Sequence, residues 1–139
     1  MELHDYKYEE IETGKIFEFK RLLTSQDVSD FSKLTGDENP LHLDEKCARN
    51  TKFGNRICQG MLAASLFSAL FGMVCPGKNN LYLSQTLNFK RPIKINSEIK
   101  VRGTVEKKID SLKILLVKTE IFCNENVVID GEAKVQIIH

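Results

Sequence analysis

The chain has 139 residues, of which 42% are hydrophobic and 28% are charged, a balance typical of one globular domain. Its net charge of +1 gives no basic surface for nucleic acid or for anionic lipid. Residues 1–15 lack the apolar core of a secretory signal. The 4 cysteines include no C-x-x-C pair, so they suggest neither a zinc site nor a disulfide framework. We therefore expect a cytoplasmic protein with a single domain over residues 1–139, free thiols, no metal ion and no cofactor.

The first elements are a strand and a short helix. Residues 15–22 alternate phenylalanines with charged residues, which predicts a strand. Thr24 and, three residues later, Asp27 resemble a helix-starting capping box, and apolar residues at helical spacing follow. Gly36 can end that helix as a left-handed cap.

The next stretch, "GDENPLH" at residues 36–42, predicts a loop, because Pro40 disfavours helical geometry at Asn39. A second short helix is expected from Asp44 to about Asn50.

Residues 60–74 are apolar around nearly the whole circumference of a helix, so other structure should enclose them. The charge-free run at 57–77 is interrupted by glycine, serine and proline. Its densely apolar part, from Met61 to Cys75, suits a buried helix better than a bilayer span. We expect no membrane insertion.

Four strand-like segments complete the chain, at residues 81–89, 99–106, 112–123 and 127–137. The segment 112–123 is apolar on both faces, which places it centrally or at an interface. The short joins at 109–112 and 124–127 favour hairpins. One buried helix wrapped by a curved antiparallel sheet satisfies this order, so the fold class is α+β, of the hot-dog kind.

Three motifs carry a family resemblance: "GDENPLHLDEKCA", "GMLAASLFSALFG" and "YLSQTLNFKRPI". Together they resemble the MaoC-like, or (R)-specific, enoyl-CoA hydratases, over roughly residues 12–138. The Gly-Asp-x-Asn-Pro-Leu-His run is the most specific of them. The resemblance implies a hot-dog fold and reversible addition of water to a trans-2-enoyl thioester.

Site residues follow from the resemblance position by position. Asp37 and His42 resemble the acid/base pair that holds the reacting water, and Asn39 resembles the amide that shapes their loop. The backbone N–H of Gly60 resembles the oxyanion donor to the thioester carbonyl. The chain departs from the family at Gln59, where relatives commonly have histidine.

The chemistry needs groups of these kinds. A base must take a proton from water while an acid delivers one to Cα, and negative charge builds on the thioester oxygen. The first N–H of a helix is unpaired and lies at the positive end of the helix dipole, and a glycine there permits close approach. Taken alone, Asp37 could be a turn former and His42 a structural loop residue. Taken together, they favour the catalytic interpretation.

The long helix also predicts the acyl pocket. Ala64, Ser68 and Phe71 fall on nearly the same helical face as Gly60 and could line a pocket for the acyl chain. Phe71 could close its floor and favour chains of about four to six carbons, an estimate from helical rise. The alternative is that Phe71 packs into the sheet and limits nothing. Ser65 is expected to bond back to the preceding turn.

The leading hypothesis is thus a hydro-lyase that acts on an acyl-CoA thioester. A 3-hydroxyacyl-carrier-protein dehydratase is the nearest alternative, and a hot-dog thioesterase or a non-catalytic acyl-thioester-binding module are others. Lys90, Arg91 and Lys94 are candidates for a phosphate contact, although a solvated edge is the simpler interpretation. We expect a homodimer or a multiple of it, because segment 112–123 has more apolar surface than one small domain buries.

Overall fold

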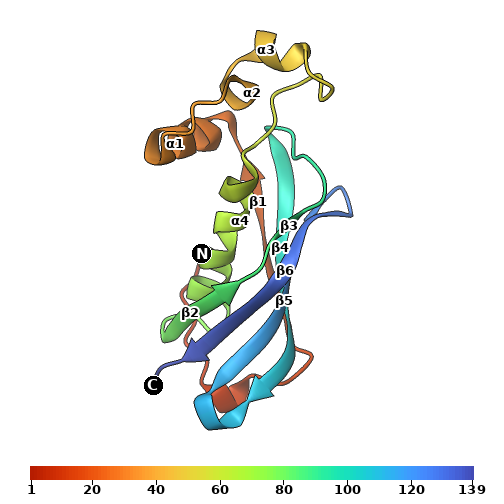
Figure 1. Ribbon diagram of the computed structural model, residues 1–139. Coiled ribbons are helices and arrows are strands. Elements are labelled where there is room, and N and C mark those ends of the chain that lie inside the picture. The colour runs from red at the N-terminus through yellow and green to blue at the C-terminus, as the bar shows by residue number, and fades with distance from the viewer.

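Six strands form one antiparallel sheet, and the long helix α4 lies along one face of it in the computed structural model, which describes residues 1–139 (Figure 1). The strands are β1 (Ile16–Leu23), β2 (Asn80–Gln85), β3 (Asn88–Phe89), β4 (Ser97–Ile109), β5 (Ile114–Cys123) and β6 (Asn126–Ile137). The helices are α1 (Ser25–Thr35), α2 (Pro40–Leu43), α3 (Glu45–Arg49) and α4 (Gly60–Ala69), with short turns η1 (Tyr8–Glu10), η2 (Leu70–Val74) and η3 (Asp110–Leu112). This arrangement confirms the predicted α+β hot-dog fold.

The sheet order is β1-β4-β5-β6-β2, with β3 also paired to β6. β5 is therefore central, as its apolar composition predicted. The turn between β5 and β6 consists of Asn124 and Glu125, both with positive φ (50° and 67°), which suits the twist of a tight hairpin. η3 joins β4 to β5, so both expected hairpins are present.

The segment predicted as one strand at 81–89 is divided into β2 and β3, which both pair with β6. At the break the backbone approaches β6 very closely, because a Cβ on Gly131 would lie 1.8 Å from the Thr86 carbonyl oxygen. β2 forms a free edge of the sheet. Its leucines face outward (Leu81 is 49% exposed and Leu83 is 44% exposed), while Tyr82 turns toward the core.

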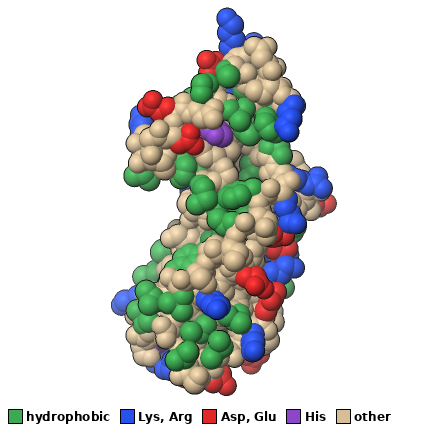
Figure 2. All heavy atoms as spheres, in the orientation of Figure 1, with side chains coloured by type: hydrophobic (Ala, Val, Ile, Leu, Met, Phe, Trp, Pro, Cys, Tyr) green, Lys and Arg blue, Asp and Glu red, His purple; other side chains and the backbone are tan.

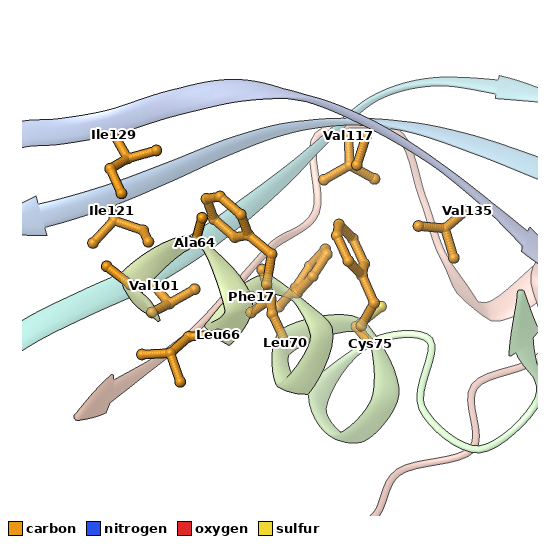
Figure 3. Close-up of a cluster of buried hydrophobic side chains, with 14 of the residues drawn as sticks. Phe17, Ala64, Leu66, Leu70, Cys75, Val101, Val117, Ile121, Ile129 and Val135 are labelled. Atoms are coloured by element: carbon orange, nitrogen blue, oxygen red, sulfur yellow. The ribbon is translucent and has the colours of Figure 1, made fainter. Parts of the chain in front are cut away.

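The core lies between α4, its π-helical continuation η2 and the concave face of the sheet (Figure 3). Phe67, Leu70 and Phe71 are at most 1% exposed and pack against aliphatic residues of β4, β5 and β6. Each such side chain contributes roughly 1.5–3 kcal/mol through burial.

The expectation that α4 is enclosed on every side is wrong for a single chain, because Met61 is 54% exposed and Ser65 and Ser68 are exposed as well.

Between β1 and α4 the chain makes a helical excursion, α1 to α3, at one end of the sheet (Figure 1). The capping box is present at the start of α1, and Gly36 ends that helix with φ 82°, both as predicted. Residues 36–42 are not wholly a loop. Pro40 begins the one-turn helix α2, because the first helical position needs no N–H donor. No helix in the structure has the length and apolar character needed to cross a bilayer.

Candidate active site

The helical excursion meets the N-terminus of α4 at a hollow, where Figure 2 shows a histidine side chain in purple. A cavity of about 400 Å³ lies there and is here named the loop cavity. It is lined by Phe31, Thr35, Asp37, His42, Gln59, Gly60 and Met61. Three of the predicted site residues, Asp37, His42 and Gly60, are thus brought together.

His42 is oriented by its backbone surroundings. Its Nδ1 lies 2.8 Å from the Ile57 carbonyl oxygen, which can only accept, so Nδ1 carries a hydrogen. In the neutral ring Nε2 is then an acceptor. Arg56 donates from Nε to the His42 carbonyl oxygen at 2.6 Å and holds the backbone of α2 in place. A half-buried imidazole held in this way presents a basic nitrogen to the loop cavity.

Asp37 shapes its own loop and still faces the cavity. Its Oδ1 accepts from the Asn39 N–H at 3.2 Å, and its own N–H donates to the Thr35 hydroxyl oxygen at 3.2 Å. The turn-forming interpretation is therefore correct, and it leaves the second carboxylate oxygen unused. Asp37 and His42 line one cavity and do not bond to each other.

Asn39 lines none of the cavities described here. Its side-chain oxygen accepts from the Leu41 N–H at 3.1 Å and caps α2. This capping role agrees with the loop-shaping part of the prediction, and the exposed Asn39 side chain makes no contact that points to substrate.

Gly60 is the first residue of α4, and its N–H has no acceptor in the chain. The Phe89 ring lies close against it, since a Cβ at this position would be 2.7 Å from Phe89 Cδ1. Only glycine therefore leaves both the ring and the helix N-terminus where they are. The free N–H is the donor that a developing oxyanion requires.

A second cavity of about 410 Å³, the mouth cavity, shares His42, Gly60 and Met61 with the first. It extends to Phe53, Ile57, Cys58, Phe89, Lys90, Arg91, Pro92, Ile93 and Ile129. Burial, with the Asp27 carboxylate nearby, raises the pKa of the Cys58 thiol to about 11. Cys58 therefore stays protonated at neutral pH and is not suited to act as a nucleophile.

A third cavity of about 390 Å³, the helix cavity, runs along α4 and shares Met61 with the other two. Ala64 and Ser68 line it, as their helical register predicted, and so does Ser65. The Ser65 hydroxyl donates back to the Leu62 carbonyl oxygen at 2.6 Å, as expected.

Phe71 does not line any of these cavities. It is fully buried, with ring centroids 5.0 Å from Tyr82 and 6.1 Å from Phe17 in edge-on contacts. Tyr82 lines the helix cavity in its place. Burial raises the pKa of the Tyr82 hydroxyl to about 12, and that hydroxyl bonds to Gln85, which in turn donates to Thr119 at 2.7 Å. The sequence did not reveal Tyr82 as a cavity residue, because alternation along β2 does not by itself show which face meets the core.

Comparison with known proteins identifies the family of this chain. The family model described as "MaoC like domain" matches residues 8–126, most of the chain. This chain belongs to the MaoC-like domain family.

Relatives of this MaoC-like chain match over nearly its whole length. A 3-hydroxybutyryl-CoA dehydratase of Methylorubrum extorquens is 38% identical over 98% of this chain and 87% of the relative. A mitochondrial 3-hydroxyacyl-[acyl-carrier-protein] dehydratase of Solanum lycopersicum is 38% identical over 88% of this chain and 75% of the relative. An R-hydratase from Pseudomonas aeruginosa, solved without ligand, superimposes with a TM-score of 0.94 at 35% identity and covers 99% of this chain and 88% of its own.

The MaoC-like site thus combines a basic imidazole nitrogen, a carboxylate oxygen and an unpaired helix N-terminal N–H around one hollow. This set can move a proton from water to carbon while it stabilises negative charge on a carbonyl oxygen.

Proposed function

We propose that this protein is an (R)-specific enoyl-CoA hydratase that reversibly adds water to a trans-2-enoyl thioester. The observation that carries the proposal is that Asp37, His42 and the start of α4 at Gly60 line one cavity. Near-full-length relatives named as hydratases and dehydratases support it.

In the hydration direction, water lies between the free Asp37 oxygen and Nε2 of His42. One of these groups takes a proton from the water as the water oxygen attacks Cβ, and the other delivers a proton to Cα. The thioester carbonyl oxygen accepts from the Gly60 N–H, so the enolate charge forms at the positive end of α4. Removal of one oxyanion donor from comparable sites costs about 3 kcal/mol of transition-state stabilisation.

The mouth cavity supports entry of the thioester carrier from the side of Phe53 and Phe89. Lys90 and Arg91 lie at this opening, and Lys90 forms an ion pair with Asp130 at 3.4 Å while Arg91 forms none. The free Arg91 guanidinium suits a phosphate group of coenzyme A or of a carrier-protein prosthetic arm. We therefore propose that acyl-CoA is the substrate, with acyl carrier protein as the alternative carrier.

The test is to incubate purified protein with a four-carbon 2-enoyl-CoA and follow the loss of the conjugated enoyl chromophore. The expected product is the (R)-3-hydroxyacyl-CoA, identified by chiral separation. The same acyl group on acyl carrier protein should react more slowly if CoA is the carrier. Release of free CoA would indicate a thioesterase, and an (S) product would contradict the assignment.

A further inference from the structure

Gln59 precedes Gly60 and contributes a buried polar side chain, 3% exposed, to the loop cavity that also holds Asp37 and His42. Although Gln59 occupies the N-cap position of α4, its side chain makes no capping bond to that helix. It points instead toward α1.

The amide has only one orientation that satisfies its neighbours. Nε2 lies 3.2 Å from the Val28 carbonyl oxygen and 2.9 Å from the Ser32 hydroxyl oxygen. A carbonyl oxygen only accepts, so the nitrogen must face α1 and Oε1 must face away from it. Oε1 is buried and has no hydrogen-bond partner in the chain. A buried amide oxygen without a donor is destabilising, so a donor from outside the chain is expected.

Polar groups of the loop cavity do not supply that donor. The Asp37 carboxylate is an acceptor, and so is Nε2 of neutral His42 because Nδ1 carries the hydrogen. The Thr35 hydroxyl already donates to the Phe31 carbonyl oxygen at 2.8 Å. A small hydroxylic molecule that enters the cavity can satisfy Oε1.

We propose that Oε1 of Gln59 accepts a hydrogen bond from the reacting water and, after hydration, from the 3-hydroxyl of the product. This inference rests on the proposed hydratase function. It follows from the count of protons on water. The Asp37/His42 pair takes one proton from the water and passes one proton to Cα, so the proton count of the pair is unchanged at the end of the step.

The second proton of the water stays on its oxygen, and an acceptor that cannot remove this proton is suited to hold it. As the water oxygen forms its bond to Cβ, the π electrons of the double bond move to Cα and pick up the proton that the pair passes on. The base breaks one O–H bond, and the other O–H bond survives as the product hydroxyl. An amide oxygen is too weakly basic to remove that proton, so Gln59 would hold this surviving O–H throughout and aim a lone pair of the water at Cβ.

Gln59→Met tests the contact, because methionine has a similar length and no strong acceptor. We expect kcat to fall about tenfold, the size of one lost hydrogen bond, with little change in KM because the residue contacts water and not the thioester. Ser32→Ala is the matched control. It removes one partner of Nε2, leaves Oε1 intact, and should lower Tm while kcat stays near the wild-type value.

Gln59→His distinguishes a contact with water from a merely structural role of Gln59. It also tests the proposed contact if Gln59→Met fails to fold. Imidazole can donate to α1 and accept from water, so kcat should be near wild type at high pH. Protonation of the new imidazole, ordinarily near pH 6.5, should change the acid side of the pH–rate profile relative to that of the wild-type protein.

Two outcomes in a folded, active protein would overturn the inference. One is wild-type kcat for Gln59→Met, and the other is wild-type kcat together with a wild-type pH profile for Gln59→His. A wild-type protein inactive on every 2-enoyl thioester would instead remove the proposed function, and this inference with it.

Discussion

His42 can accept a proton because a hydrogen bond on the far side of its ring fixes the other nitrogen as the donor. A backbone hydrogen bond also positions Asp37, since one carboxylate oxygen accepts from the Asn39 N–H and the other is left for water. In each case a backbone contact within the excursion between α1 and α4 orients a polar group toward the loop cavity.

The first prediction concerns this pair. Asp37→Asn and His42→Gln should each lower the rate of enoyl-CoA hydration at least about a hundredfold, because each removes a proton-transfer group. Asparagine keeps the oxygen that accepts from Asn39, so the loop should survive. Steady-state kinetics together with a thermal melt checks this. Near-normal activity in either folded variant would refute the assignment.

The sequence predicted Asp37 and His42 as site residues because their residue types are unusual neighbours within one short motif, and it predicted Gly60 through the family resemblance of a second motif. The structure brings the three together at the loop cavity, and their catalytic roles stay predictions. The sequence did not reveal that Gln59 has an unpaired oxygen, since that depends on α1 lying within hydrogen-bond reach of Nε2. Nor did it find Tyr82, whose orientation depends on which face of β2 meets the core.

Among the elements, α1 begins the helical excursion between β1 and α4, and the stability of α1 depends on its N-terminal cap. The Thr24 hydroxyl oxygen accepts from the Asp27 N–H at 3.1 Å, and Asp27 accepts from the Thr24 N–H at 2.9 Å. Burial by itself would raise the pKa of Asp27. The hydrogen bonds from Thr24 and the Arg21 guanidinium at 2.8 Å outweigh burial and hold that pKa below its usual value.

A second prediction follows for stability against pH. Asp27→Ala should lower the free energy of unfolding by about 1 kcal/mol at neutral pH, as loss of a helix cap usually does. Because the folded-state pKa is the lower one, the ionised carboxylate stabilises the fold above about pH 4, and this contribution is lost as pH falls through the folded-state pKa. Urea unfolding at several pH values should show the two proteins converge in acid. A gap that is unchanged at low pH would contradict this origin.

The third prediction compares two residues of the predicted acyl-pocket face, Ser68 near the end of α4 and Phe71 in η2. Phe71→Ala should cost about 3–5 kcal/mol in stability without changing the acyl-length profile, because Phe71 lies in the core behind Tyr82. Ser68→Leu is the contrasting variant, since Ser68 is exposed and lines the helix cavity. It should shift preference toward shorter enoyl chains with little effect on Tm. A shift of Phe71→Ala toward longer enoyl chains would instead support Phe71 as the floor of the acyl pocket.

Most helices and strands were predictable because local signals agree with the tertiary fold: the Thr24 cap, the Gly36 stop and the two-sided apolar run of β5. Two features were not. α2 forms after a proline that looked like a breaker, since Asn39 caps it and Pro40 fits its first position. The buried face of β2 could not be assigned, because an edge strand can leave leucines outside where another surface could cover them.

At the scale of the molecule, the dimer stays a prediction, but segment 112–123 supports it less than expected. Its β5 part is central and has no large exposed apolar side chain, and only Leu112 before β5 is exposed, at 54%. Other exposed apolar side chains lie on β2, on β3 and at the start of α4, where Met61, Leu81, Leu83 and Phe89 are 54%, 49%, 44% and 51% exposed. Figure 2 shows apolar surface over this part of the molecule.

The fourth prediction is that β2 pairs with β2 of a second copy, which would satisfy the free strand edge and cover the open side of α4. Sedimentation at micromolar concentration should give a dimer or a multiple of it. Leu83→Lys should weaken assembly and lower activity together, because Leu83 also lines the helix cavity. Leu34→Lys is the matched control, since Leu34 is 84% exposed on α1, outside that surface. A fully active monomer at these concentrations would show that the helix cavity needs no second subunit to close it.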